Sequence, residues 1–218
     1  MRELGFLHKF VKPTGGSRLT LLLLHGTGGN EGDLIQLGHE LSPGAALLSP
    51  RGKVLENGMP RFFRRLGEGI FDVNDLVDQT HNLAVFTREA SRAYGFDLGR
   101  VVAVGYSNGA NIAGSALILH PETLAGAVLF RPMVPFAPDT MPRLSGKPIL
   151  ILAGLRDSIV PKDETERLAA LLKRAGADLT LRWADATHGI SSEEVEAARE
   201  WVSGKFPGAD LPLNNRQE

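Results

Sequence analysis

The sequence predicts an α/β fold: a single domain on a mostly parallel sheet, with helices on both faces and no lid domain. Short apolar runs alternate along the chain with longer segments of helical pattern, which is the order that builds a parallel sheet. Most of these runs are apolar on successive residues, as expected of strands covered on both faces. The length of 218 residues fits one hydrophobic core.

The strands and helices are expected in alternation. We expect strands at Leu19 to Leu24, Ala45 to Leu48, Val101 to Val104, Ala127 to Phe130, Ile149 to Leu152 and Leu179 to Trp183, and an edge strand at Phe6 to Val11. We expect helices at residues 31–41, 72–94, 109–119, 162–175 and 191–204. Asp72 is suited to be the N-cap of the longest helix, with Asp75 in its first turn. The domain is expected to span residues 1–207, and the tail at 208–218 to be frayed, because it has little to bury.

Composition excludes several classes of function. Lysine and arginine total 24 against 25 acidic residues, for a formal net charge of −1, so nucleic acid is not an expected partner. The chain has no cysteine, which excludes disulfides and a thiolate nucleophile. The charged start is unlike a signal peptide, and the longest apolar run is too short for membrane insertion. A cytoplasmic protein is expected, either a monomer or a homodimer.

A G-x-S-x-G sequence at Gly105 to Gly109 follows an apolar run and precedes a small-residue helical segment. A serine on a sharp strand-to-helix turn needs glycine on both sides, because the backbone there leaves no room for a Cβ atom. A Gly/Ser turn without chemistry is the alternative. The strand before it and the helix after it favour Ser107 as a nucleophile.

A serine nucleophile needs a base and an acid, which on this fold follow it in the order acid, histidine. Asp157 and His188 each follow a predicted strand, so both are expected at the carboxyl edge of the sheet with Ser107. Asp185 and Asp139 are alternative acids, and Asp157 could instead cap the helix that begins near Lys162. The other histidines are weaker candidates by placement, including His25, which precedes the serine: His8, His25, His39, His81 and His120.

The first long strand ends in the sequence His25 to Asn30, which we call the glycine loop. Backbone N–H groups of Thr27 and Asn108 are the expected oxyanion hole. The same glycines, followed by Arg51 after the next strand, also allow a dinucleotide-binding protein. A hydrolase fold kept as a non-catalytic binding module is a further alternative.

Two segments are expected to control access to the site. Residues 131–147 hold four prolines and are too few for a helical lid, so the site is expected to be open. The stretch from Arg61 to Asp72 carries charges among aromatic residues. Arg64, Arg65 and Glu68 are expected to bind substrate there, because arginine beside aromatic rings suits an acidic or aromatic ester. A solvated charged loop is the alternative.

These motifs resemble the α/β-hydrolase superfamily and, within it, the small lidless phospholipase/carboxylesterase family that includes acyl-protein thioesterases. The resemblance covers nearly the whole chain and rests on four segments: His25 to Glu31, Gly105 to Ala110, Asp157 with Val160-Pro161, and His188-Gly189. The stretch from Arg61 to Asp72 is similar to bacterial carboxylesterases associated with quinone stress or ring cleavage, and departs from the thioesterases. The resemblance implies serine carboxylesterase chemistry with no metal or organic cofactor, and the expected absence of a lid favours short acyl esters as substrates. A thioesterase or lysophospholipase of the same fold is the alternative.

Overall fold

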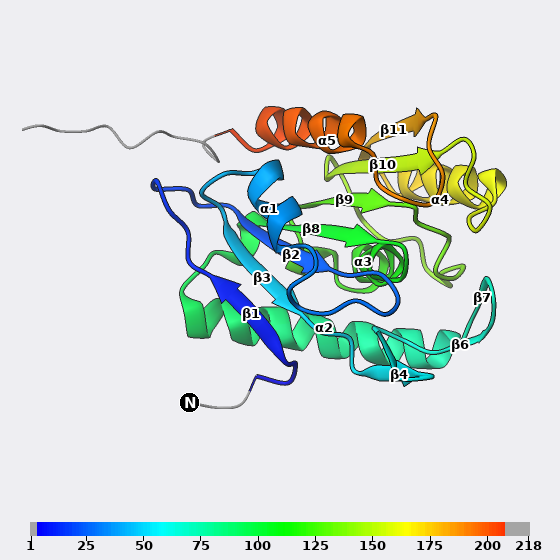
Figure 1. Cartoon of the computed structure of the whole chain (residues 1–218), viewed down its shortest axis with the longest axis horizontal. Helices are drawn as coiled ribbons and strands as arrows, with labels where there is room; N and C mark the ends of the chain where they lie inside the picture. Colours follow the sequence, from blue (N-terminus) through cyan, green and yellow to red (C-terminus); the bar gives the residue numbers. More distant parts are fainter. Residues whose placement is uncertain (1–3, 208–218) are drawn as a thin grey trace, which may run out of the picture.

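The apolar runs form a seven-stranded sheet in the computed structural model, which describes residues 4–207 (Figure 1). The strands lie in the order β1 (His8–Val11), β3 (Ala46–Pro50), β2 (Thr20–Leu24), β8 (Val101–Tyr106), β9 (Gly126–Phe130), β10 (Pro148–Gly154) and β11 (Asp178–Ala184). Strand β1 pairs antiparallel with β3, and every other pair is parallel. The predicted fold class is confirmed.

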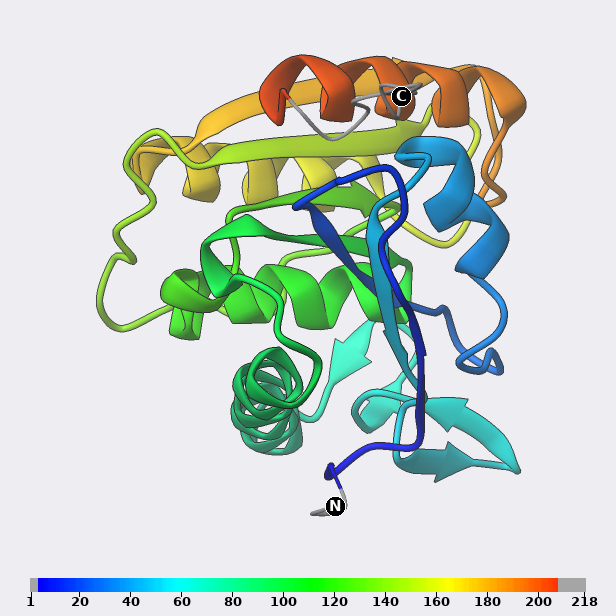
Figure 2. The same ribbon diagram turned by 90° about the vertical axis from the view of Figure 1, so that its left-hand side faces the viewer.

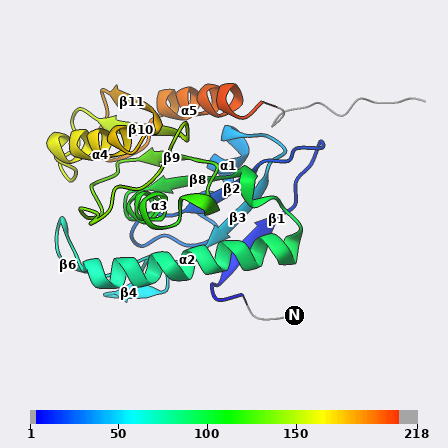
Figure 3. The same ribbon diagram turned by 180° about the vertical axis from the view of Figure 1, so that it is seen from behind.

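Helices cover both faces of this sheet, as Figures 2 and 3 show. One face carries α1 (Ile35–Leu41) and α5 (Ser192–Lys205), and the other carries α2 (Val73–Tyr94), α3 (Asn108–Leu119) and α4 (Lys162–Arg174). Alternate residues of β2 therefore enter different cores: Leu21 and Leu23 pack with α1 and α5, while Leu22 and Leu24 pack with the other three helices. Two 3-10 helices complete the set, at Leu98–Arg100 and Pro121–Thr123.

The four longer helices begin and end within one residue of their predicted bounds, and the Asp72 side chain caps α2 by accepting the Asp75 N–H at 3.1 Å. Helix α1 is shorter than predicted, because it begins at Ile35 and not at residue 31. The Asn30 side chain accepts the Gly32 N–H at 2.8 Å. This bond holds the residues before Ile35 in a turn instead of a helix.

Two small hairpins occupy the segment between β3 and α2, where a loop was expected. Strands β4 (Val54–Glu56) and β5 (Met59–Arg61) form the first hairpin, and β6 (Arg65–Gly67) and β7 (Ile70–Phe71) form the second. The first turns at Asn57-Gly58, with φ of 51° and 80°. These angles are those of a type I′ turn, for which Asn-Gly is a recognised sequence signal.

Residues 131–147 connect β9 to β10 without any helix or strand. The expected absence of a lid domain therefore holds for this segment. Within residues 4–207, no helix is long and apolar enough to cross a membrane. The expected frayed tail at 208–218 lies outside the described residues.

Helix α3 lies directly against the ends of β2 and β8, and glycine makes this approach possible. A Cβ atom at Gly109 would lie 1.9 Å from the carbonyl oxygen of Leu24. A Cβ atom at Gly105 would lie 2.6 Å from the carbonyl oxygen of Gly109. Both distances are far inside van der Waals contact with backbone atoms, so the helix could not keep its place if either residue had a side chain.

Replacing Gly109 by alanine is therefore expected to lower the free energy of unfolding by about 1–3 kcal/mol or more. Gly204→Ala in α5 is the matched control, because a Cβ atom there meets no heavy atom within 4 Å. That control is expected to be neutral or to gain up to about 1 kcal/mol. Urea denaturation measures both variants, and a Gly109→Ala protein as stable as the wild type would contradict this packing.

Candidate active site

Ser107, His188 and Asp157 meet at the carboxyl edge of the sheet, although they lie far apart in the sequence. The His188 Nε2 atom lies 3.0 Å from the Ser107 Oγ atom. The His188 Nδ1 atom lies 2.9 Å from the Asp157 Oδ2 atom. The structure thus joins the three residues in one hydrogen-bonded chain, in the order that a serine, a base and an acid require.

Ser107 occupies a strained backbone position between β8 and α3. Its φ is 51° and its ψ is −113°, a conformation that residues other than glycine rarely adopt. Its N–H donates to the carbonyl of Phe130 at 2.9 Å, and its own carbonyl accepts the Asn111 N–H at 3.0 Å. The neighbouring strand and the first turn of α3 therefore hold the serine in this conformation.

Asp157 is buried, with its side chain 2% exposed. Its Oδ1 atom accepts the N–H groups of Ile159 at 2.8 Å and Val160 at 3.1 Å. Burial alone would raise the pKa of Asp157, but these two N–H groups and His188 outweigh burial and hold the pKa below its ordinary value. Asp157 therefore carries a negative charge beside His188 at neutral pH.

The alternative acids lie elsewhere. Asp185 is exposed and pairs with Arg156 at 2.6 Å, and Asp139 is also exposed. Asp157 does not cap α4 either, because that helix begins after Pro161 with no side-chain cap. Of the three candidate carboxylates, only Asp157 contacts His188.

The remaining histidines contact other groups. His8 bonds to the Tyr94 hydroxyl, His81 bonds to His120, and His39 is exposed on α1. His25 is buried beneath the glycine loop: its Nδ1 atom lies 2.6 Å from the Gly26 carbonyl oxygen, and its Nε2 atom accepts the Gly52 N–H at 3.0 Å. His25 therefore supports the backbone of the loop.

Arg61 also supports the glycine loop. It is 3% exposed, and its Nη1 atom donates to the Thr27 hydroxyl at 2.7 Å while its Nε atom donates to the Phe63 carbonyl at 3.2 Å. Glu56 neutralises it at 3.2 Å. The Asn108 side chain accepts the Phe62 N–H at 2.8 Å. The segment around Arg61 thus contacts both residues expected to form the oxyanion hole.

The N–H groups of Thr27 and Asn108 have no hydrogen-bond acceptor among the described residues. The N–H of Asn108 is at the start of α3, where helical N–H groups have no partner within the helix. Both groups are therefore available for an external acceptor.

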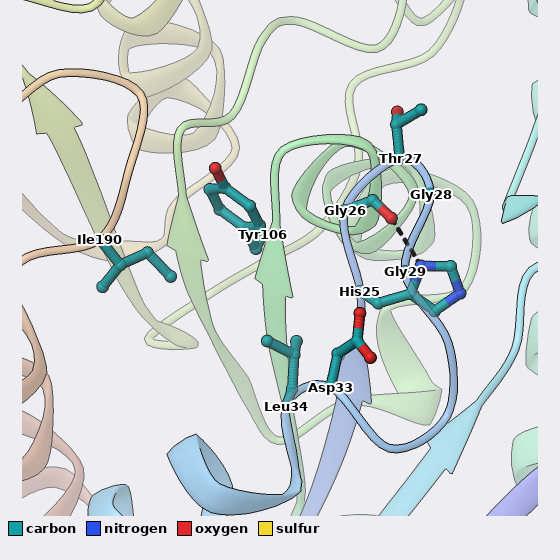
Figure 4. Close-up of a pocket in the computed structure, with 9 residues that line it drawn as sticks. All are labelled: His25, Gly26, Thr27, Gly28, Gly29, Asp33, Leu34, Tyr106 and Ile190. Carbon is teal, nitrogen blue, oxygen red and sulfur yellow. Dashed lines mark hydrogen bonds between the residues drawn. The ribbon is translucent and has the colours of Figure 1, made fainter. Parts of the chain in front are cut away.

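A pocket of about 450 Å³ lies beside the glycine loop (Figure 4). Residues 25–29 of the loop form one wall, and Tyr106 and Ile190 lie across from them. Tyr106 precedes Ser107, and its hydroxyl donates to the His188 carbonyl at 3.2 Å. The pocket is therefore framed by the segments that carry the serine, the histidine and the candidate oxyanion donors.

Three glycine N–H groups and Arg51, on which dinucleotide binding would depend, are engaged within the protein. The Gly28 N–H donates to the Pro60 carbonyl, the Gly29 N–H to the Gly26 carbonyl, and the Gly32 N–H to Asn30. Arg51 makes two hydrogen bonds to Glu31. These groups are not free to bind a phosphate. Within residues 4–207, three or more His, Asp or Glu side chains nowhere converge in a way that could hold a metal ion.

The residues expected to bind substrate lie on and beside the second hairpin. The Arg64 Nε atom donates to Asp72 at 3.1 Å, and the Arg65 Nε atom donates to Glu56 at 2.8 Å. Glu68 is exposed in the turn between β6 and β7. Phe62 and Phe63, two of the aromatic residues in this stretch, are fully buried in the core.

Sequence reasoning missed Arg131 and Glu194, which are buried beside Asp157 and His188. The Arg131 Nε atom lies 3.8 Å from Asp157, and its Nη1 atom lies 2.5 Å from Glu194. The only sequence signal for Glu194 was its position three residues after Ser191, the spacing of a capping box, which the structure contains.

Known proteins share this architecture. Residues 72–203 match the model of the dienelactone hydrolase family. The protein MhqD of Bacillus subtilis strain 168 is 50% identical over 193 residues, which are 88% of this chain and 96% of MhqD.

Two solved carboxylesterases are also similar. The Bacillus cereus carboxylesterase has a TM-score of 0.88 at 49% sequence identity, covering 91% of this chain and 93% of that chain. The Mesorhizobium loti carboxylesterase has a TM-score of 0.88 at 32% identity, covering 94% and 97%.

The contacts of His25 predict how it titrates. Because Nε2 accepts a hydrogen bond, the proton must lie on Nδ1, and burial lowers the pKa of His25 below its ordinary value although the Gly26 carbonyl acts in the opposite direction. The stability that depends on neutral His25 is then complete above the unfolded pKa of about 6.5 and is lost as the pH falls through the folded pKa.

A titration followed by NMR of the imidazole nitrogens is expected to give a midpoint below 6.5 for His25, with the Nδ1–H tautomer above it. A midpoint above 6.5, or the Nε2–H tautomer, would contradict the assigned contacts.

Proposed function

We propose that this chain, which belongs to the dienelactone hydrolase family of α/β-hydrolases, is a serine carboxylesterase for short-chain or aromatic esters. It is a hydrolase related to bacterial carboxylesterases. The proposal adds the serine mechanism, the roles of individual residues and the class of ester.

The hydrogen-bonded chain from Ser107 through His188 to Asp157 carries this proposal. A serine hydroxyl alone is a weak nucleophile, and a base within hydrogen-bond reach activates it. Asp157 would keep the Nδ1 proton on His188 and would stabilise the imidazolium that forms when Nε2 takes the serine proton. A buried carboxylate with a lowered pKa is suited to both tasks.

In the proposed reaction, the Ser107 Oγ atom attacks the ester carbonyl while His188 Nε2 accepts the hydroxyl proton. The carbonyl oxygen becomes an oxyanion, which the N–H groups of Thr27 and Asn108 would stabilise. His188 then gives its proton to the departing alkoxide, which leaves as an alcohol, and the acyl group remains bonded to Ser107. Water, deprotonated by His188, cleaves the acyl-serine, releases the carboxylic acid and restores the serine.

The class of ester is inferred from access to the site. The segment that could carry a lid has no helix or strand, and the pocket beside the glycine loop holds about 450 Å³. A pocket of this size has room for a small acyl or aryl group, and without a lid nothing would enclose a long chain. Short-chain and aromatic esters are therefore the proposed substrates, and thioesters test the related alternative.

A fluorophosphonate is expected to label the protein at one residue, Ser107, because an activated serine attacks the phosphorus atom. Peptide mapping by mass spectrometry locates the label. Ser107→Ala and His188→Ala are each expected to lose on the order of 10⁴-fold in kcat on nitrophenyl acetate. Ser203→Ala, at an exposed serine of α5, is the matched control and is expected to be labelled and active.

The same assay compares nitrophenyl esters and thioesters of increasing acyl length, and short chains are expected to be the better substrates. A label on another serine, or labelling that survives Ser107→Ala, would overturn the serine assignment. A preference for long chains would overturn the proposed ester class.

Arg64, Arg65 and Glu68 are proposed to select the substrate from the edge of the site. Arg64→Ala or Arg65→Ala is expected to raise KM about tenfold for an acidic or aromatic ester, and less for a neutral aliphatic ester of similar size. Stability should change little, because exposed ion pairs contribute only about 0–1 kcal/mol. Arg199→Ala, at an ion pair of α5, is the control.

Steady-state kinetics on the two esters and a thermal melt decide this question. An equal rise in KM for both esters, or a large loss of stability, would return these arginines to a structural role.

A further inference from the structure

We propose that the buried ion pair of Arg131 and Glu194 is a positioning pair that holds Asp157 and His188 in line with Ser107. This inference rests on the serine hydrolase function proposed above. It adds two residues, one after β9 and one in α5, that would act on the reaction through the acid and the base without touching the substrate.

Arg131 uses its whole hydrogen-bonding capacity inside the protein. Its side chain is 0% exposed, and an arginine has five N–H donors. The Nε atom donates to the Thr187 carbonyl at 3.0 Å. The Nη1 atom donates to the Leu152 carbonyl at 3.2 Å and to Glu194 at 2.5 Å, and Nη2 donates to the Gly189 carbonyl at 2.6 Å and to Glu194 at 2.7 Å. These are five bonds for five donors.

The acceptors of Arg131 place it at the centre of the loops that carry the acid and the base. Thr187 and Gly189 are the residues on either side of His188, so one side chain holds the backbone on both sides of the base. Leu152 lies in β10, the strand that leads to Asp157. A displacement of Arg131 would therefore move the His188 loop relative to both Ser107 and Asp157.

The backbone of Arg131 is itself strained in the left-handed region, with a φ of 58°. Its N–H donates to the same Leu152 carbonyl at 2.9 Å. This conformation directs the residue after β9 into the protein instead of continuing the strand. The strain is maintained by the bonds of the same residue, which links the backbone geometry to the position of the loop.

Glu194 keeps the charge of Arg131 from acting on the acid. The Arg131 Nε atom lies 3.8 Å from the Asp157 Oδ2 atom, which is the oxygen that contacts His188. An unpaired guanidinium there would compete with His188 for the Asp157 charge. Glu194 is 2% exposed and binds two guanidinium nitrogens, so Asp157 remains available to His188.

The remaining groups that face His188 do not supply this charge balance. Ser107 contacts its Nε2 atom, and the Tyr106 hydroxyl from β8 donates to its backbone carbonyl.

Stability alone is also a weak reason to bury the pair of Arg131 and Glu194, because replacing such a pair by apolar residues is often neutral or stabilising. The positions of the five acceptors point instead to the geometry of the acid and the base.

Glu194→Gln and Arg131→Lys test the inference. Glutamine keeps the shape of Glu194 but removes its charge, and lysine keeps the charge of Arg131 but loses the planar fork. Each variant is expected to lower kcat on nitrophenyl acetate by about 10- to 100-fold, with KM changed less than about twofold. The reason is that the reacting groups are misplaced, while the contacts that bind the substrate are unchanged. The rate of fluorophosphonate labelling at Ser107 is expected to fall by a similar factor.

The pH profile separates positioning from simple loss of structure. In Glu194→Gln, the unpaired Arg131 guanidinium is expected to attract the Asp157 carboxylate. The imidazolium of His188 is then less stabilised, and the acid limb of kcat/KM moves to lower pH. Glu196→Gln is the matched control. It removes the carboxylate from a two-bond arginine pair on the same helix, but on its exposed side, and is expected to match the wild type in kcat and in pH profile.

If Glu194→Gln does not fold, Glu194→Asp replaces it, which keeps the charge and shortens the side chain. Folded variants of Glu194 and Arg131 with wild-type kcat, labelling rate and pH profile would overturn the inference, as would a loss of thermal stability with unchanged kcat. If the wild-type protein is neither labelled at Ser107 nor active on any ester, the proposed function itself has failed. That result differs from the failure of the positioning pair, in which the wild-type protein is labelled and active.

Discussion

The parallel register of the central strands is the constraint on which the site depends. Tyr106 lies opposite Phe130, and Phe130 lies opposite Leu152. The next residues continue the ladder, because the Ser107 N–H donates to the Phe130 carbonyl and the Arg131 N–H to the Leu152 carbonyl. Strands β8 and β9 therefore end in step, and β10 continues for two residues beyond them to Gly154. The serine, the buried arginine and the loop of Asp157 follow at one edge, where parallel α/β sheets gather their functional groups.

Two buried arginines divide the support of the site between them. Arg61 contacts Thr27 of the glycine loop and is neutralised by Glu56, so it serves the side where the oxyanion would form. Arg131 contacts both neighbours of His188 and is neutralised by Glu194, so it serves the side of the acid and the base. In each case a planar guanidinium links segments that the chain leaves far apart, and a carboxylate removes the cost of an unpaired buried charge.

The sequence indicated those parts of the molecule that local patterns encode. Apolar runs located the strands, and the glycines around Ser107 matched a turn that excludes a Cβ atom. The order of Asp157 and His188 after successive strands placed them at the same edge. The first hairpin is also encoded locally, in Asn57-Gly58, within a segment where no strand is predicted. The shortened start of α1 follows from one Asn30 hydrogen bond that no periodicity reveals.

The parts that sequence reasoning missed depend on contacts across long separations. Arg131 and Glu194 are 63 positions apart, and Arg61 and Thr27 are 34 apart. Phe62 and Phe63 lie between charged residues and yet are fully buried. Nothing in the composition of these segments distinguishes a buried arginine or glutamate from a solvated one, because both residue types are mostly exposed in proteins. Only the three-dimensional structure shows which charges are enclosed.

A crystal structure of the protein after reaction with a small phosphonate tests the central claim most directly. The account predicts a covalent bond from phosphorus to the Ser107 Oγ atom, with the phosphoryl oxygen about 3 Å from the N–H groups of both Thr27 and Asn108. His188 should remain hydrogen-bonded to Asp157. A phosphoryl oxygen directed away from both N–H groups, or phosphorus bonded to another residue, would contradict the account.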